Sequence, residues 1–134
     1  MKSTLNTVCI LLVILIFSDG NWPFNLNIIN PSAPIEVDRL TVVIVEETEN
    51  RDSIPSSQLN AISSQVWRDY VEEDGGQWRV LDPHTDISKD KPWVKESLNK
   101  ERTSLPWLIV STKNDGYSGP MPNTVDELMG IIKK

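Results

Sequence analysis

The segment that decides the fold is Ser104-Leu105-Pro106-Trp107-Leu108-Ile109-Val110. It contains an X–Pro bond, a type of peptide bond that adopts the cis form in a small fraction of cases. An apolar run follows the proline without interruption, and such a run is typical of a strand buried in a sheet. We therefore predict a β-strand over residues 107–111 that the chain enters through a proline turn.

Three further strands are expected in the rest of the chain. Residues 40–45 form a continuous run rich in β-branched side chains, which indicates a strand buried on both faces of a parallel sheet. A second strand is predicted at Gln77–Leu81, where Asp82-Pro83 ends it. The third follows Asn114-Asp115-Gly116, a typical hairpin turn, and Tyr117 opens it as an edge strand.

A long helix is predicted between the first two of these strands in sequence. The polar residues 46–53 indicate a loop with solvated carboxylates, and the helix is expected over residues 55–73, with Ser53 or Ile54 at its cap. Gly75-Gly76 would end it. The predicted apolar face repeats at helical spacing and consists of Leu59, Ile62, Val66 and Tyr70, with Trp67 beside Val66.

Two more helices complete the order of elements. Residues 92–102 predict a short helix with Trp93 among its apolar contacts. Residues 124–132 give the clearest helical pattern, because Thr124-x-x-Glu127 is a capping box and apolar residues follow at helical spacing. The predicted order is therefore strand, helix, strand, helix, strand, strand, helix.

The size and charge of the chain narrow the classes of function. At 134 residues, it has room for one domain with a core of its own. A formal net charge of −6 argues against a nucleic-acid binder, because phosphate contacts need a surplus of Lys and Arg. The same charge disfavours adsorption to an anionic membrane surface. The single cysteine is Cys9, so the domain is expected to have no internal disulfide.

The N-terminus has the pattern of a targeting segment. Residues 8–17 are all apolar, and this run is too short to span a bilayer comfortably, which needs about 20 residues. Lys2 precedes the run, and the small residues Ser18 and Gly20 follow it, which is typical of a signal peptide cleaved after Gly20. An uncleaved anchor and a buried helix are the alternatives.

These features divide the chain into three parts. Residues 1–20 are predicted to be a signal peptide or a short membrane anchor, in which residues 5–18 would enter the membrane. Residues 21–34, with several Pro and Asn, are predicted to be an extended linker, and residues 35–134 the folded domain. We expect a bacterial or phage protein that is exported, to the periplasm or the extracellular space, or anchored in the membrane.

The predicted domain resembles the thioredoxin-like superfamily over residues 35–134. The resemblance is carried by Leu105-Pro106 before a buried strand, by Gly116 in the next turn, by Ser118-Gly119-Pro120 and by the capped final helix. It implies an α/β fold, a βαβαββα three-layer sandwich with a central mixed sheet, preceded by the N-terminal hydrophobic segment. It also implies that the Leu105-Pro106 bond is cis and that its loop faces the start of the first helix.

The thiols that carry the chemistry of that family are missing. Where the family has Cys-x-Pro-Cys at a helix start, this chain has Ser53-Ile54-Pro55-Ser56. Dithiol–disulfide exchange needs a low-pKa thiolate and a second thiol, and a serine hydroxyl supplies neither. The sequence therefore argues against the activities of thioredoxins, glutaredoxins, disulfide isomerases and peroxiredoxins.

The interpretation we favour is a non-redox binding or structural module, with no catalytic residue, cofactor or metal. In the family, an extended peptide pairs with the backbone beside the cis-proline, and such main-chain hydrogen bonds need no thiol. By resemblance, the partner would be a protein or an extended peptide. The groove that receives it would be lined by Ser53, Pro55, Ser56, Leu105, Pro106, Trp107, Gly119 and Pro120.

Two other functions stay open at this point. The first is an enzyme of another class that uses Asp82, His84 and Asp86, which alternate and so share one side of an extended loop. A metal site or Ser-His-Asp hydrolysis is the chemistry such residues would support, although the same residues are common in ordinary turns. The second is an accessory protein of a thiol-redox pathway that borrows thiols from its partner.

Overall fold

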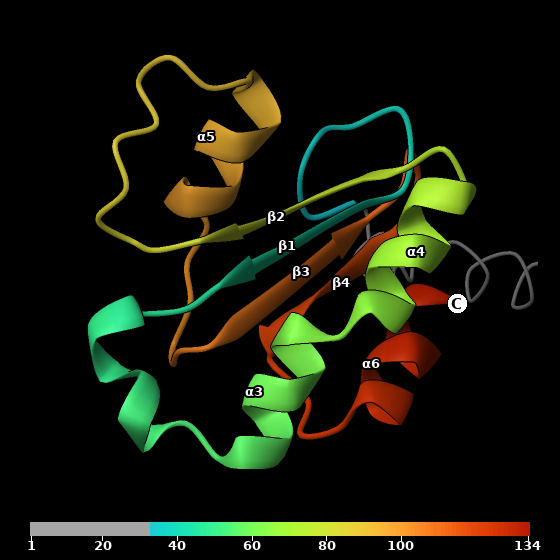
Figure 1. Ribbon diagram of the computed structural model, residues 1–134. Coiled ribbons are helices and arrows are strands. Elements are labelled where there is room, and N and C mark those ends of the chain that lie inside the picture. The colour runs from blue at the N-terminus through green and yellow to red at the C-terminus, as the bar shows by residue number, and fades with distance from the viewer. Residues whose placement is uncertain (1–32) are drawn as a thin grey trace, which may run out of the picture. The chain divides into compact units, whose positions relative to one another are not determined.

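A four-stranded mixed sheet forms the centre of residues 33–134, the part of the chain that the computed structural model describes (Figure 1). The strand order is β2-β1-β3-β4, in which β1 is parallel to β2 and antiparallel to β3, and β3 is antiparallel to β4. The predicted strands are confirmed, and each end that was predicted lies within one residue of the observed end. They are β1 (Thr41–Val45), β2 (Gln77–Leu81), β3 (Trp107–Ser111) and β4 (Gly116–Pro120).

Helices cover both faces of this sheet, which makes the domain a mixed α/β structure (Figure 1). One face is covered by three helices and the other by a single helix, as their buried side chains show. The first group is α3 (Ser56–Ser63), α4 (Gln65–Glu73) and α6 (Val125–Ile132). The single helix is α5 (Pro92–Asn99), and a short 3₁₀ helix, η2 (Thr48–Ser53), follows β1.

Strand β1 is buried on both of its faces, as its apolar run predicts. Val42 and Ile44 belong to the core beneath α3, α4 and α6, whereas Val43 and Val45 belong to the core beneath α5. Alternate side chains of a strand point to opposite faces, so one apolar run supplies both cores. This double burial fixes β1 as an interior strand.

The prediction of one long helix over residues 55–73 is wrong, because the chain breaks at Ser64. This residue has extended backbone angles, with φ −65° and ψ 133°, and it separates α3 from α4. Its side chain accepts a hydrogen bond from the backbone N–H of Val66 at 3.1 Å and so caps α4. Ser64 therefore acts as an N-cap inside an apolar pattern that runs on across the break.

The break also rotates the buried face of α4 relative to the predicted one. Val66, which was expected in the core, is 57% exposed, whereas Trp67 and Val71 are fully buried. The indole Nε1 of Trp67 donates a hydrogen bond to the carbonyl of Ala61 at 2.8 Å, and this bond ties the start of α4 to α3. Trp67 is thus a core residue, as expected. It lies on the buried face of α4, whereas Val66, predicted beside it on that face, is exposed.

Residues 46–53 differ from the predicted solvated loop. Glu46 is only 2% exposed, and its carboxylate receives both Nε, at 3.0 Å, and Nη2 of Arg51. The rest of the stretch contains η2, in which Ser53 Oγ donates to the carbonyl of Asn50 at 2.7 Å. Pairing with a guanidinium is what allows a carboxylate to be buried here.

The ends of the other helices follow the sequence closely. Gly75 takes a positive φ of 80° just after α4, a conformation that favours glycine, as expected of a helix stop. Helix α5 ends three residues earlier than predicted, at Asn99. Thr124 is confirmed as the N-cap of α6, because its Oγ1 accepts from the backbone N–H of Glu127 at 3.2 Å. The reciprocal bond of a capping box is not formed within residues 33–134, since the Glu127 carboxylate accepts from the Thr124 hydroxyl at 3.1 Å instead of from its backbone N–H.

The predictions on the N-terminal segment lie outside the described residues. The signal peptide or anchor of residues 1–20, and all but the last two residues of the linker at 21–34, are among these. Residues Ala33–Lys134 make up one compact unit. Within residues 33–134, none of the helices is long and apolar enough to cross a membrane.

Candidate functional site

The turn between α5 and β3 is built around Leu105 and Pro106. The peptide bond between them is cis, which is the isomer that the resemblance implies. Pro106 is buried, and its carbonyl accepts a hydrogen bond from the N–H of Met121 at 3.1 Å. Leu105 lies on the surface, with 37% of the residue exposed. The turn therefore combines a buried residue, Pro106, with an exposed one, Leu105.

Strand β4 brings the next predicted groove residues beside this turn. Trp107 pairs with Pro120 in the β3–β4 register, and its Nε1 donates to Ser118 Oγ at 3.0 Å. Gly119 is buried, and a Cβ at this position would lie 2.6 Å from Tyr117 Oη. The position therefore excludes larger side chains while Tyr117 keeps its place. Trp107 is itself buried, so it supports the site from below more than it lines a surface.

The start of α3 is fixed to the segment that follows β4. Gln58, in the first turn of α3, donates from Nε2 to the carbonyl of Met121 at 2.7 Å. Because the N–H of Met121 binds the carbonyl of Pro106, this bond connects the helix start to the proline turn. Pro55 occupies the N-cap position of α3, so the prediction of Ser53 or Ile54 as its cap is wrong.

Ser53 and Leu105, far apart in sequence, line one small pocket. Its volume is about 110 Å³, and Glu47, Asn50 and Ile54 complete its wall. Ser53 is exposed and lies at the end of η2, one turn before α3 begins. Pro55 and Ser56, which were predicted for the same groove, are exposed but are not among the residues that line this pocket.

The backbone of Leu105 has hydrogen-bonding capacity that the domain does not use. Within residues 33–134, neither its N–H nor its carbonyl makes a hydrogen bond. Backbone donors and acceptors are nearly always paired in proteins, with water where they are exposed. Leu105 is an exposed residue with two unpaired backbone groups, which makes it a candidate for pairing with an extended chain.

The loop with Asp82 and His84 has a structural role in the local backbone. Asp82 accepts from the N–H of His84 at 2.8 Å and from the N–H of Thr48 at 2.9 Å. These hydrogen bonds hold the pKa of the Asp82 carboxyl well below its ordinary value. The exposed His84 ring lies with Nδ1 at 3.2 Å from Asp82 Oδ1. The carboxylate thus joins two loops of the domain.

Asp86, the third residue of that loop, also bonds its own backbone. Its carboxylate accepts from the N–H of Ser88 at 3.0 Å, which lowers the pKa of the Asp86 carboxyl. In the part of the chain that the structure describes, no three side chains of His, Cys, Asp or Glu are grouped as metal ligands. The carboxylates of Asp82 and Asp86 therefore bond backbone N–H groups of their own loop, as in an ordinary turn.

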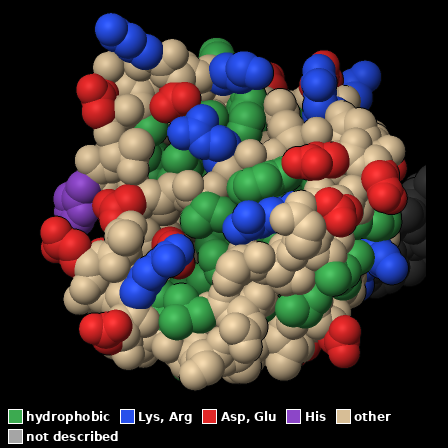
Figure 2. Space-filling model, in the orientation of Figure 1, with side chains coloured by type: hydrophobic (Ala, Val, Ile, Leu, Met, Phe, Trp, Pro, Cys, Tyr) green, Lys and Arg blue, Asp and Glu red, His purple; other side chains and the backbone are tan. Residues whose placement is uncertain are grey.

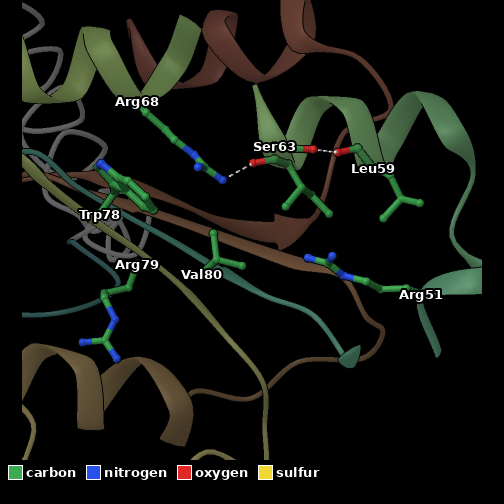
Figure 3. A pocket seen from close by; sticks show the side chains of 8 residues that line it. Arg51, Leu59, Ser63, Arg68, Trp78, Arg79 and Val80 are labelled. Carbon is green, nitrogen blue, oxygen red and sulfur yellow. Dashed lines mark hydrogen bonds between the residues drawn. The ribbon is translucent and has the colours of Figure 1, made fainter. Parts of the chain in front are cut away.

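A larger cavity, which the sequence did not reveal, lies on the face formed by α3, α4 and β2 (Figure 3). Its volume is about 360 Å³. We call it the arginine groove, and its principal lining residues are Arg51, Leu59, Arg68, Trp78 and Val80. These residues come from four separate elements, so no local motif indicates the groove. Its three arginines, Arg79 included, are scattered along the sequence.

Comparison of the chain with protein-family models, curated proteins and solved structures found no match.

Proposed function

We propose that residues 33–134 form a thioredoxin-like module without redox activity, which binds an extended segment of a partner protein at Leu105. The observed order of elements and the strand order β2-β1-β3-β4 support the thioredoxin-like part of this proposal. The single observation that carries the binding part is the unpaired backbone of the exposed residue Leu105, whose N–H and carbonyl have no partner within residues 33–134.

The geometry around Leu105 suits recognition through main-chain hydrogen bonds. An extended peptide that pairs with backbone groups needs a rigid edge, and the buried Pro106 and the β3–β4 ladder hold this one in place. The pocket shared by Leu105 and Ser53 could receive one side chain of such a peptide. Affinity would come from the backbone pairing and selectivity from this pocket.

The non-redox part of the proposal follows from the residues at the helix start. Ser53 and Ser56 flank Ile54-Pro55, and neither hydroxyl can serve as a thiolate nucleophile or as a resolving thiol. Ser53 Oγ is engaged with the carbonyl of Asn50. The proposed module therefore holds its partner without forming a covalent bond to it.

We propose in addition that the N-terminal segment directs this module out of the cytoplasm or anchors it in a membrane. The apolar residues 8–17 between Lys2 and Gly20 support this. Expression in a bacterial host is expected to give either a chain that starts near Asn21 or a full-length chain in the membrane fraction, as intact mass shows. Full-length protein in the soluble cytoplasmic fraction would refute both forms of the proposal.

The binding proposal can be tested by titrating the full-length ¹⁵N-labelled chain with an uncharged hexapeptide of alternating Ser and Val, blocked at both ends. Saturable shifts are expected for the amide of Leu105 and for residues of the adjacent pocket. The matched control is the same peptide with every internal amide N-methylated, which keeps the side chains but removes the main-chain donors on both edges. Equal affinity for both peptides, or shifts that leave Leu105 unchanged, would refute the proposal.

A second measurement tests the absence of redox chemistry. The full-length chain is expected not to accelerate the reduction of a protein disulfide by dithiothreitol, because no thiol accompanies the helix start. Catalysis comparable to that of a working thioredoxin would contradict the proposal.

A further inference from the structure

The arginine groove runs along β2 beneath the junction of α3 and α4. Figure 3 shows Arg68 and Trp78 at one end, Arg51 at the other and Val80 between them. Figure 2 shows the same face, where hydrophobic side chains gather with Lys or Arg side chains among and beside them. A cationic groove with an apolar floor is notable in a chain with a net charge of −6.

Arg68 has nitrogen donors that the domain leaves unused. Its guanidinium lies 4.5 Å from the ring centre of Trp78 and 5.3 Å from that of Trp67, so two indoles hold it in place. Nη2 donates to the carbonyl of Ile62 at 3.0 Å, and Nη1 makes no hydrogen bond within residues 33–134. Nε is buried without a partner, so it is Nη1 that is left for a ligand. An arginine held by stacking, with donors to spare, is well suited to bind a carboxylate.

The charges of the three arginines in the groove are not equally balanced. Arg51 is paired with Glu46, and Arg79 is paired with Asp90 at 3.0 Å. Among residues 33–134, Arg68 has no carboxylate within salt-bridge distance. The nearby carboxylate of Glu72 accepts a hydrogen bond from Trp78 Nε1 at 2.9 Å. Arg68 is therefore the cation of this groove that an incoming anion would neutralise.

The backbone of β2 offers a second point of attachment in the same groove. Gln77 donates its N–H to Leu40, and Leu81 accepts from the N–H of Glu46, both at 2.9 Å, so alternate residues of β2 bond to β1. Trp78 and Val80 consequently direct their backbone groups away from β1, at the edge of the sheet. Because β2 is an edge strand that pairs only with β1, no other strand of the described sheet takes up these groups. Such an edge can accept an added strand.

We propose that the arginine groove binds an extended acidic peptide segment, which adds to β2 and places one carboxylate on Arg68. The backbone pairing would involve Trp78 and Val80, and the side chains of the added strand on the helix side would alternate between Arg68 and the apolar floor. An acidic segment is favoured because its carboxylate complements the charge of Arg68. An extended segment is favoured because the free edge of β2 pairs with a strand. This site is separate from the one at Leu105 and stands independently of it.

The test is a titration of the full-length ¹⁵N-labelled chain with the hexapeptide Thr-Glu-Thr-Val-Thr-Glu, blocked at both ends, in which Glu and Val share one face of the extended chain. The control peptide has Gln in place of Glu, which preserves shape and removes charge. Saturable shifts of the Trp78 and Val80 amides are expected, with Kd about tenfold lower for the Glu peptide than for the Gln peptide. Equal Kd values, or shifts that leave both amides unchanged, would overturn the proposal.

Protein variants separate Arg68 from general charge attraction. Arg68→Gln is expected to raise Kd for the Glu peptide about tenfold, whereas Arg39→Gln, an equal charge change at an exposed site, should alter Kd less than about twofold. If Arg68→Gln fails to fold, Arg68→Lys keeps the charge but loses the planar fork, and it should still weaken binding. Equal effects of the substitutions at positions 68 and 39 would overturn the assignment to Arg68.

Discussion

Replacing Trp67 by Phe should destabilise the domain by about 2–3 kcal/mol. The indole is fully buried, and its Nε1 bonds the carbonyl of Ala61. Loss of that hydrogen bond costs about 1 kcal/mol. The smaller ring adds a cavity and lost-contact cost of about 1–2 kcal/mol. Part of the edge-to-face contact with Trp78, whose ring centre lies 5.4 Å away, would survive in Phe.

The matched control for this prediction is Trp78→Phe. Trp78 is only half-buried, and its Nε1 bonds the exposed carboxylate of Glu72, so the expected cost is below about 1 kcal/mol. Urea unfolding followed by far-UV circular dichroism measures both variants without relying on tryptophan fluorescence, and an unchanged m-value would show comparable unfolding. A Trp67→Phe variant as stable as Trp78→Phe would refute the role of Trp67 in joining α3 to α4.

Three further predictions concern the sheet, the last helix and the response to acid. Ile109→Asp should abolish cooperative thermal unfolding, because it buries an unpaired carboxylate in β3 at a cost of several kcal/mol; a near-wild-type melt would contradict this placement. Thr124→Ala should lower the free energy of unfolding, measured in urea, by about 1 kcal/mol, because it removes the N-cap of α6. Asn123→Ala, at the exposed neighbouring residue, should lower it far less. Equal losses would refute the capping role of Thr124. Asp82→Asn should lower the free energy of unfolding most at neutral pH. The lowered pKa of Asp82 stabilises the fold above about pH 3.9, and this contribution is lost as the pH falls further. A difference in unfolding free energy between variant and parent that does not change with pH would count against this prediction.

Local patterns were sufficient to predict most of the regular structure. Three features each have a cause within a few residues: the β-branched run of β1, the proline entry to β3 and the N-cap at Thr124. The break at Ser64 was missed because apolar residues at helical spacing continue across it, and the capping bond to Val66 forms only when the chain turns there. The same omission led to the wrong prediction that Val66 is buried, whereas the burial of Trp67 was expected.

The candidate sites depend more on tertiary contacts than the secondary structure does. The sequence singled out Leu105 and Ser53, which line one pocket, but it could not indicate which backbone groups stay unpaired. Glu46 was predicted to be solvated because its pairing with Arg51 depends on η2, which the sequence analysis did not predict. The arginine groove had no sequence signal, since Arg68 meets Trp78 across two elements of the fold.

The central claim, that an extended peptide pairs with the backbone of Leu105, is tested most directly by the solvent exchange rate of that single amide. The rate can be measured by NMR on the full-length chain with and without a saturating amount of the Ser-Val hexapeptide. Pairing predicts that exchange of the Leu105 amide slows at least about tenfold with this peptide, as for an amide that enters a stable hydrogen bond, and stays unchanged with the N-methylated control. An unchanged rate at saturation would contradict the claim.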